Sequence, residues 1–575
     1  MMKQRANLVG NLLIAAFLSM CLITSAWASK ASLEFLSKPD IRANPNPSAP
    51  FAAILTFETN KEVNTRIEIL SGDTRRTLSY DHDEIFQNGL PIVGLIPGAH
   101  HEIRVTISDP DGKLLPATST VEFTTPDLPT EAEAFPIIET KRFSKTPMEP
   151  GITMFNPRRT RSEDGLSPEQ FKKFKQGFGI LIAVDGAGNV IWYYRGDSRI
   201  SDFELLRNGN VIFLTQDYRA VEIDVLGNIV RQWYAKHRPQ GPVEGGIPVD
   251  ALTLHHDIDE LPNGNFLVLA SELRQIKNFF GSELDEKAPR KDQWIMGDKV
   301  LEFERSGKVV WSWNAFDYLD VMRIGYGTFG NYWHVRGFPG ALSWTHANAV
   351  TLFDHESILV NYRFQSAITK IDRKTGDIQW IAGEPSGWSA PLQAKLLTMK
   401  GNKRWFWHQH DSKITPNGTL LLFDNGNAQA RPFEKPIPPS QTRSRAVEYA
   451  LDQQKMTLRE KWSSIIPNDL AVISSAMGSV QYLPNTENLL VGYGLILSQD
   501  DAHNKGWHNL AETDTWTRVR EYTHDSPPKV VWELTLRARD NDYGLGWTLF
   551  GARRFDHFPP RSVHNSNESN AFPGK

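Results

Sequence analysis

The stretch ILIAVDGAGNVIWYY, residues 180–194, contains the unit that decides the fold. An apolar strand leads into a turn of Asp, Gly and Asn, and a second strand returns to Trp192. Apolar runs on either side of a short turn rich in Gly and Asn are typical of a β-hairpin with buried strands. The unit recurs along the chain, and this recurrence predicts the architecture.

Five further copies of the unit end in tryptophan. They are AVEIDVLGNIVRQW (220–233), VLEFERSGKVVWSW (300–313), ITKIDRKTGDIQW (368–380), and the looser VEYALDQQKMTLREKW (447–462) and RVREYTHDSPPKVVWEL (518–534). Asn-Gly hairpins such as LPNGNFLVLA (261–270) and ITPNGTLLLF (414–423) alternate with them. Six copies predict six blades of a β-propeller, because sheets packed face to face around a central channel leave only short, protected edges.

A different pattern precedes the repeat. Four segments alternate apolar and polar residues with a period of two, which is typical of half-buried strands. They are FAAILTFETN (51–60), NTRIEIL (64–70), HEIRVTISD (101–109) and STVEFTT (119–125). The sequence therefore predicts an all-β protein: a small immunoglobulin-like or fibronectin-like β-sandwich over residues 29–130, followed by the six-bladed propeller over residues 131–575.

Residues 1–28 have the pattern of a signal peptide. Lys3 and Arg5 form a basic start, an apolar run follows, and the small-residue motif AWA ends at Ala28. We expect export to the periplasm and no stable membrane insertion after cleavage. An uncleaved anchor and lipoprotein processing at Cys21 are the alternatives. Since Cys21 is the only cysteine, cleavage leaves no thiol for a disulfide, a nucleophile or a metal site.

Composition excludes some classes of partner. The formal net charge of −4 argues against a nucleic-acid binder driven by phosphate contacts. The sequence has no G-x-x-x-x-G-K-[ST] loop and no G-x-G-x-x-G after a predicted strand, so no nucleotide cradle is expected. The chemistry must therefore come from side chains at one end of the propeller, where loops cluster.

Three predicted hairpins have histidines just before their first strand. They are LTLHHDIDELPNGN (252–265), LSWTHANAV (342–350) and WFWHQHDSKITPNGT (405–419). His256 and His410 each lie seven residues before the Asn of their turn. Equivalent positions on successive blades face the mouth of the central channel, so we expect His256, His346 and His410 to converge there. Arg363 ends the next strand, whereas His255 and His408 are expected to point into a blade or sideways.

This constellation permits two chemistries. Neutral imidazoles can bind zinc, or can act without metal as nucleophile, acid and base. A guanidinium forks two donors toward an oxyanion, and it would add positive charge to a metal cluster. Arg363 thus favours an anionic substrate handled by the histidines themselves. A metal-dependent propeller polysaccharide lyase or hydrolase and a non-enzymatic binding propeller stay open as alternatives.

At these residues the sequence resembles the bacterial arylsulfate sulfotransferases, which move a sulfuryl group between phenols without a nucleotide donor. The matching motifs are HHDIDELPNGN (255–265), WTHANAV (344–350) followed by NYR (361–363), HQHD (408–411), SRAVEY (444–449) and MGSVQYLPN (477–485). The resemblance implies a sandwich followed by a six-bladed propeller, no cofactor or metal, a phenolic sulfate donor, a phenol acceptor and a homodimer. Family members can have a disulfide near the site, which this chain lacks after cleavage.

The resemblance also implies roles. His410 looks like the nucleophile that becomes transiently sulfated in a ping-pong reaction. His256 and His346 look like the residues that protonate the leaving phenol and stabilise the sulfuryl oxygens, and Arg363 looks like the sulfate-binding arginine. Whether His255 or His256 is the active-site residue is left open. Further substrate contacts are expected from Asn348, His255 and Trp407.

Overall fold

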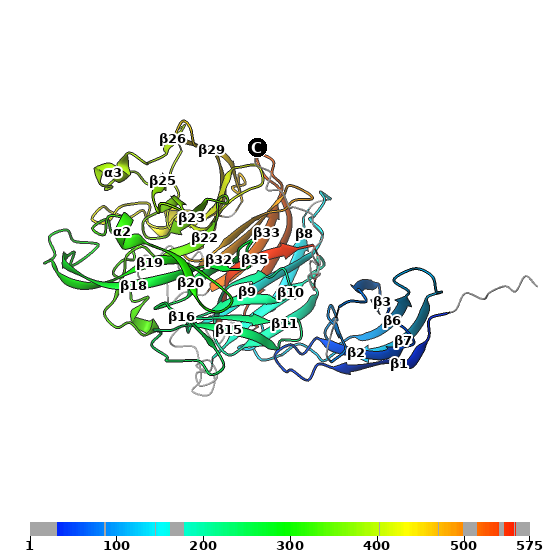
Figure 1. The fold of residues 1–575 in the computed structure, drawn as a ribbon. Helices are drawn as coiled ribbons and strands as arrows, with labels where there is room; N and C mark the ends of the chain where they lie inside the picture. The colour runs from blue at the N-terminus through cyan, green and yellow to red at the C-terminus, as the bar shows by residue number, and fades with distance from the viewer. Residues whose placement is uncertain are drawn as a thin grey trace, which may run out of the picture.

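The protein is built almost entirely of strands (Figure 1). The computed structural model describes residues 32–84, 88–143, 145–161, 177–401, 403–469, 471–497, 515–539, 545–556 and 558. The predicted signal peptide lies outside these residues. The two α-helices among them, α2 (Ala315–Tyr318) and α3 (Ala390–Gln393), are single turns. No helix of the described part is long and apolar enough to cross a membrane.

The N-terminal strands form the predicted sandwich, drawn in blue in Figure 1. One sheet has the order β1 (Phe35–Ala43), β2 (Ala53–Thr59), β5 (Leu90–Ile92), and the other β4 (Thr74–Tyr80), β3 (Asn64–Ser71), β6 (His100–Ser108), β7 (Ala117–Thr124). The alternating residues Leu55, Ile67 and Val105 are fully buried between the sheets. The Asn44 amide donates to Leu226 O at 2.8 Å and so ties the sandwich to the larger domain.

Six further sheets make up that larger domain within the described residues. The first sheet has the strand order β35 (Leu545–Phe555), β9 (Ile152–Arg161), β10 (Gly179–Val184), β11 (Val190–Gly196), and the second has the order β12 (Ile200–Leu205), β13 (Val211–Thr215), β14 (Arg219–Ile223), β15 (Ile229–Ala235), β16 (Ile247–Val249). The third has the order β17 (His255–Glu260), β18 (Phe266–Phe279), β19 (Lys291–Phe303), β20 (Val309–Asn314), with β21 (Leu342–Ser343) also paired to β19, and the fourth has the order β22 (Ala347–Leu352), β23 (Ser357–Tyr362), β24 (Ala367–Asp372), β25 (Ile378–Gly383). The fifth has the order β27 (His410–Ile414), β28 (Leu420–Asp424), β29 (Arg445–Asp452), β30 (Thr457–Ser463), β26 (Thr398–Lys400), and the sixth has the order β31 (Ser479–Tyr482), β32 (Leu489–Leu497), β33 (Thr515–Tyr522), β34 (Val530–Arg537), β8 (Ile137–Arg142).

The first strands of these sheets close a ring. Strands β12, β17, β22, β27, β31 and β35 contact one another in that order, and β35 contacts β12 again. Two strands close the circle: β35, late in the chain, is the innermost strand of the first blade, and β8, from before the repeat, is the outermost strand of the last. The fold is the predicted six-bladed propeller preceded by a sandwich.

Three of the repeated tryptophans hydrogen-bond to the following blade. The indole Nε1 of Trp192 donates to Val225 O at 2.9 Å, and that of Trp233 donates to Arg305 O at 3.0 Å. Trp311 donates in the same way to a carbonyl in the following blade. Each acceptor lies in the outer hairpin turn of the neighbouring blade. Each of these three tryptophans therefore packs between two blades and also satisfies a turn carbonyl.

Trp192→Phe and Trp532→Phe should separate these two contributions. Both indoles are buried, but Trp532 Nε1 has no hydrogen-bond partner. Trp192→Phe should therefore lower the free energy of unfolding by about 1–3 kcal/mol more than Trp532→Phe, because it alone leaves a carbonyl unpaired. Denaturant unfolding of the two variants measures the difference. Equal losses of unfolding free energy in the two variants would show that the repeat tryptophan stabilises the fold by packing alone.

Candidate functional site

The structure brings the histidines of three blades to one place. His256 on β17, His346 just before β22 and His410 at the start of β27 line a cavity of about 280 Å³, together with His255 and Arg363. A larger cavity of about 680 Å³ adjoins it and shares His346 and Arg363 as walls. The two cavities together offer space for a small organic molecule.

The backbone is unusual at two of these positions. His256 has φ 60° and His346 has φ 51°, both in the left-handed region that non-glycine residues avoid. The ladder between β17 and β18 shifts from His255 to Ile258, so His256 lies within a bulge. Bulges re-aim side chains and recur beside functional sites. The bulge therefore turns His256 out of the strand alternation and toward the cavity.

His410 is held in one tautomer. Its Nδ1 lies 2.7 Å from Asn425 Oδ1. The Asn425 amide nitrogen donates to Ser474 O at 2.7 Å and to Met477 O at 2.9 Å, which fixes the oxygen toward the ring. His410 Nδ1 is therefore the donor, and Nε2 bears the lone pair. That lone pair accepts only a long bond from Met477 N, at 3.2 Å.

Burial keeps His410 neutral. Burial first, and then the positive charge of Arg363, lower the pKa of His410 from its ordinary value to about 3. At neutral pH the ring is therefore unprotonated at Nε2. A neutral imidazole with a fixed Nδ1–H is a nucleophile that needs no proton removed before it attacks.

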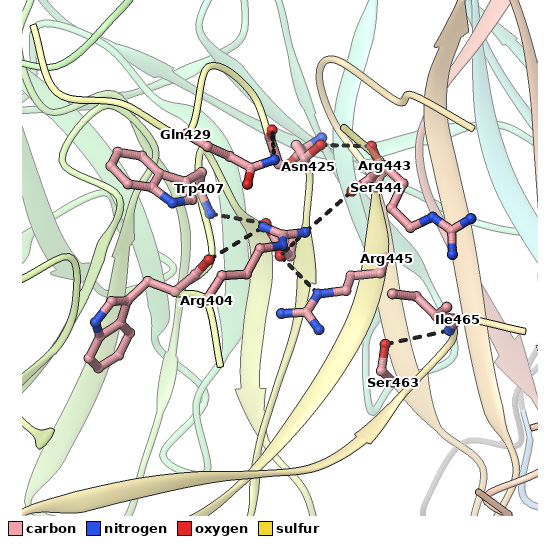
Figure 2. Close-up of polar contacts among 12 residues, drawn as sticks. Arg404, Trp407, Asn425, Gln429, Arg443, Ser444, Arg445, Ser463 and Ile465 are labelled. Atoms are coloured by element: carbon pink, nitrogen blue, oxygen red, sulfur yellow. Dashed lines mark hydrogen bonds and ion pairs between the residues drawn. The ribbon is translucent and has the colours of Figure 1, made fainter. Parts of the chain in front are cut away.

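The strand end that carries Asn425 is braced by the network in Figure 2. The buried carboxylate of Asp424 accepts from Trp407 N at 3.0 Å, and Arg404 and Arg445 contact it at 2.9 and 3.1 Å. Ser444 Oγ donates to Asn425 O at 2.7 Å. These contacts fix the amide that sets the tautomer of His410.

His255 and His256 belong to one hydrogen-bonded chain. His255 Nε2 lies 2.9 Å from Ser271 Oγ, 3.1 Å from Ala270 O and 3.3 Å from Asp298 Oδ1. The carbonyl and the carboxylate can only accept, so Nε2 donates. His255 Nδ1 must then accept from His256 Nδ1, at 2.8 Å. His256 Nε2 is left with a lone pair that accepts from Tyr332 OH at 3.3 Å. His255 thus orients His256, and His256 Nε2 is the atom that can take up a proton.

Burial also lowers the pKa of His256 and of His346 well below the ordinary value. The next largest cause is the neighbouring His255 for His256, and Arg363 for His346. Both effects penalise a positive charge in a site without substrate. A negative charge placed beside the two imidazoles would act in the opposite direction and raise the pKa of both.

Arg363 has unused donors. Its Nη2 donates to Ser475 O at 3.1 Å, while its buried Nε has no hydrogen-bond partner. No carboxylate of the described residues forms an ion pair with it. Burial lowers the pKa of Arg363 to about 10, which leaves it charged at neutral pH. A desolvated guanidinium with a free donor beside imidazoles is a binding position for an oxyanion.

Four residues lie elsewhere than expected. His255, predicted to point into a blade or sideways, lines the smaller cavity. Asn348 does not line either cavity: its amide donates to Gln409 O at 2.9 Å and so ties β22 to β27 beside His410. Trp407 is half-buried and lies outside both cavity walls, and its backbone joins the Asp424 network. His408, expected to point away, lines the larger cavity and donates to Tyr326 O at 2.8 Å.

Aromatic walls come from residues that the sequence did not single out. The Tyr332 ring lies 4.4 Å and the Phe364 ring 4.5 Å from the ring of His346. Phe550 lines the smaller cavity near His256, with ring centres 6.1 Å apart. Tyr332 lies in the segment between α2 and β21, which has no counterpart in the repeat and so no register from which to predict it.

No group of three or more His, Cys, Asp or Glu side chains in the described part of the chain is arranged to hold a metal ion. The nitrogens of His255 already have partners on both sides of the ring.

Family comparison agrees with this architecture. The sequence model described as Arylsulfotransferase (ASST) matches residues 138–540, and that described as Arylsulfotransferase Ig-like domain matches residues 41–126. The first covers the propeller and the second covers the sandwich.

Two relatives have the name Arylsulfate sulfotransferase AssT. The protein of Escherichia coli O6:H1 (strain CFT073) is 24% identical over 393 residues, which are 59% of this chain and 61% of the relative. That of Lelliottia amnigena is 24% identical over 337 residues, 49% of this chain and 52% of the relative. The chain thus aligns with 61% and 52% of the length of these two proteins. Among solved structures, a protein of unknown function from Bacteroides caccae matches with a TM-score of 0.36 and 13% identity, over 70% of this chain and 98% of that one.

Proposed function

The chain belongs to the arylsulfotransferase family, and on that premise we propose that it is an arylsulfate sulfotransferase. It transfers a sulfuryl group from a phenolic sulfate ester to a phenolic acceptor through a sulfohistidine at His410, without a nucleotide donor. The observation that carries the proposal is the neutral His410, with Nδ1–H fixed by Asn425, in a cavity whose guanidinium lacks a carboxylate. Export by residues 1–28 to the periplasm and a homodimer stay predictions.

In the first half-reaction His410 Nε2 displaces Met477 N–H and attacks sulfur in line. A nitrogen–sulfur bond forms as the sulfur–oxygen bond to the aryl group breaks. The departing phenolate takes a proton from His256 or His346, whose pKa the bound ester has raised. Asn425 Oδ1 accepts the Nδ1–H of the ring, which becomes more acidic as the ring gains positive charge.

The second half-reaction reverses these steps with another phenol. The acceptor gives its proton back to the imidazole and attacks sulfur as the nitrogen–sulfur bond breaks, which restores neutral His410. Sulfuryl transfer resembles phosphoryl transfer in spreading charge over three terminal oxygens, so positioning and charge stabilisation dominate. Arg363 supplies donors to those oxygens, and Tyr332 and Phe364 pack around the reacting group.

The proposal is tested by mass spectrometry of the intact protein. Mixed with 4-nitrophenyl sulfate alone, the protein should gain one sulfuryl group, located on the peptide that contains His410. Addition of phenol should remove the group and yield phenyl sulfate. Turnover of the ester with no covalent species in rapid-quench samples would rule out the sulfohistidine route.

Asp298→Asn probes the chain that orients His256. The change keeps the shape of the side chain but removes the charge that faces His255 Nε2 at 3.3 Å. We expect kcat to fall by about 10- to 100-fold with little change in KM, because loss of an orienting partner disturbs the tautomer and not the binding of the ester.

Glu302→Gln is the matched control. Glu302 is a buried carboxylate on the same strand, β19, but it accepts from Asn263 and Asn265 in the turn between β17 and β18 and pairs with Arg373. The variant Glu302→Gln should lower the unfolding temperature of the protein and leave kcat nearly unchanged. Equal effects of the two variants on kcat would show that Asp298 supports only the fold.

A further inference from the structure

A third cavity, of about 380 Å³, adjoins the histidine cavity and is rich in arginine. Arg158, Arg199 and Arg336 line both cavities and so form the boundary between them. Arg158 lies on β9, Arg199 just before β12, and Arg336 in the segment between α2 and β21. Three separate parts of the chain therefore bring guanidinium groups to one wall beside the reacting group.

None of these three arginines forms an ion pair with a carboxylate of the described residues, although Asp202 attracts Arg158 electrostatically. Arg158 Nε donates to Ile200 O at 2.9 Å, and its guanidinium lies over the Phe550 ring at 4.5 Å. Arg336 donates to Tyr332 O at 2.8 Å and lies over the Tyr332 ring at 3.8 Å.

The carboxylate that lines the third cavity already forms ion pairs with other arginines. Asp217 pairs with Arg219 at 2.8 Å and with Arg238 at 3.2 Å. Its negative charge is therefore shared with two other arginines, and the three guanidinium groups of the wall keep a net positive charge.

The positive charges of the three arginines oppose one another. Burial first, and then the charge of Arg336, lower the pKa of Arg199 to about 10. Burial, followed by the charge of Arg199, lowers the pKa of Arg158 well below its ordinary value. Like charges held together in a partly desolvated wall repel each other, and an anion between them removes that repulsion.

We infer that Arg158, Arg199 and Arg336 form a subsite for a second anionic group, such as a carboxylate, on the aryl ring whose sulfate is transferred at His410. This rests on the proposed function, since the same ring must reach both cavities. A neutral phenol would leave three guanidinium groups unpaired. An aryl ring with a second anion pairs them and is held with its ester oxygen toward the histidines, so the preferred substrates are aryl sulfates and phenols that have an additional negative charge.

Matched donors test the subsite. The 3- and 4-carboxyphenyl sulfates are compared with the neutral isosteres, the 3- and 4-carbamoylphenyl sulfates, each with phenol as acceptor. For at least one position the wild-type kcat/KM should be about tenfold or more higher for the carboxylate, as expected of charge-assisted hydrogen bonds. Arg199→Gln should bring that ratio near one while the carbamoyl donor changes by less than about twofold.

Two variants serve as controls. Arg199→Lys keeps the charge and should keep most of the preference. Arg75→Gln removes an exposed arginine of the sandwich, far in sequence from the cavities, and should leave the ratio unchanged. If the wild type shows no preference at either ring position, or if Arg199→Gln slows both donors equally, the subsite is refuted.

A binding measurement separates the subsite from the reaction. Calorimetric titration compares 4-hydroxybenzoate with 4-hydroxybenzamide on the wild type and on Arg199→Gln. Tighter binding of the carboxylate that is lost in Arg199→Gln supports the subsite even if no ester turns over, in which case only the proposed function fails. Equal binding of both ligands by the wild type overturns the subsite even if transfer proceeds.

Discussion

His410→Ala should abolish transfer from 4-nitrophenyl sulfate to phenol, with kcat reduced by at least about 10³-fold. The reason is that the structure prepares His410 for attack through Nε2. Its Nδ1 proton is fixed on Asn425, and its low pKa leaves Nε2 unprotonated. Release of 4-nitrophenolate, followed by absorbance, measures the loss.

Two controls keep that result interpretable. The variant leaves Asn425 Oδ1 and Met477 N without the ring, so its unfolding temperature must be measured to exclude loss of fold. His408→Gln changes a buried imidazole two residues away whose nitrogens face backbone carbonyls, and it should cost less than about tenfold in kcat. If His410→Ala retains more than a tenth of the wild-type rate, His410 is not the nucleophile.

The fold could be predicted because its signal is local and repeated. Each blade needs a buried hairpin and a large side chain against its neighbour, and Trp192, Trp233 and Trp311 mark those positions in the sequence. The two closing strands could not be predicted in this way. β35 and β8 pair with strands far away in the chain, and neither contains the tryptophan-terminated unit.

The site was only partly predictable, for a geometric reason. His256 and His410 lie equally far from their turns, which predicts equivalent positions in the strand ladder. The pairing differs: Leu269 and Phe423 are the equivalent partner positions, but Leu269 pairs with His255, whereas Phe423 pairs with His410. His256 reaches the cavity through a bulge and a left-handed backbone, not through the register. Spacing in sequence does not report how many residues a bulge holds.

Other contributors to the site had no sequence signal. Tyr332 and Arg336 lie in an insertion outside the repeat. Asp298 lies within a strand that continues a long hairpin, and only the folded chain places it beside His255. Such contacts depend on tertiary structure alone, which is why the convergence of the histidines could be predicted and the residues that orient them could not.

Arg363→Lys should lower kcat/KM by about 10²- to 10³-fold although the charge is kept. Lysine offers a compact point charge, whereas the guanidinium of Arg363 holds Ser475 O with Nη2 and still has its buried Nε free for an oxyanion. The loss should fall mainly on kcat, because charge builds up on the sulfuryl oxygens in the transition state more than in the bound ester.

Rescue distinguishes lost chemistry from lost packing. Arg363→Ala opens space beside His346 and Phe364, and added guanidinium ion should restore part of its activity, whereas added ammonium ion should restore less. The wild type and His410→Ala, assayed with the same salts, correct for effects of the ions themselves. If Arg363→Lys matches the wild type, or if ammonium rescues as well as guanidinium, a single positive charge is enough to bind the sulfuryl oxygens and the forked geometry of Arg363 has no part in the reaction.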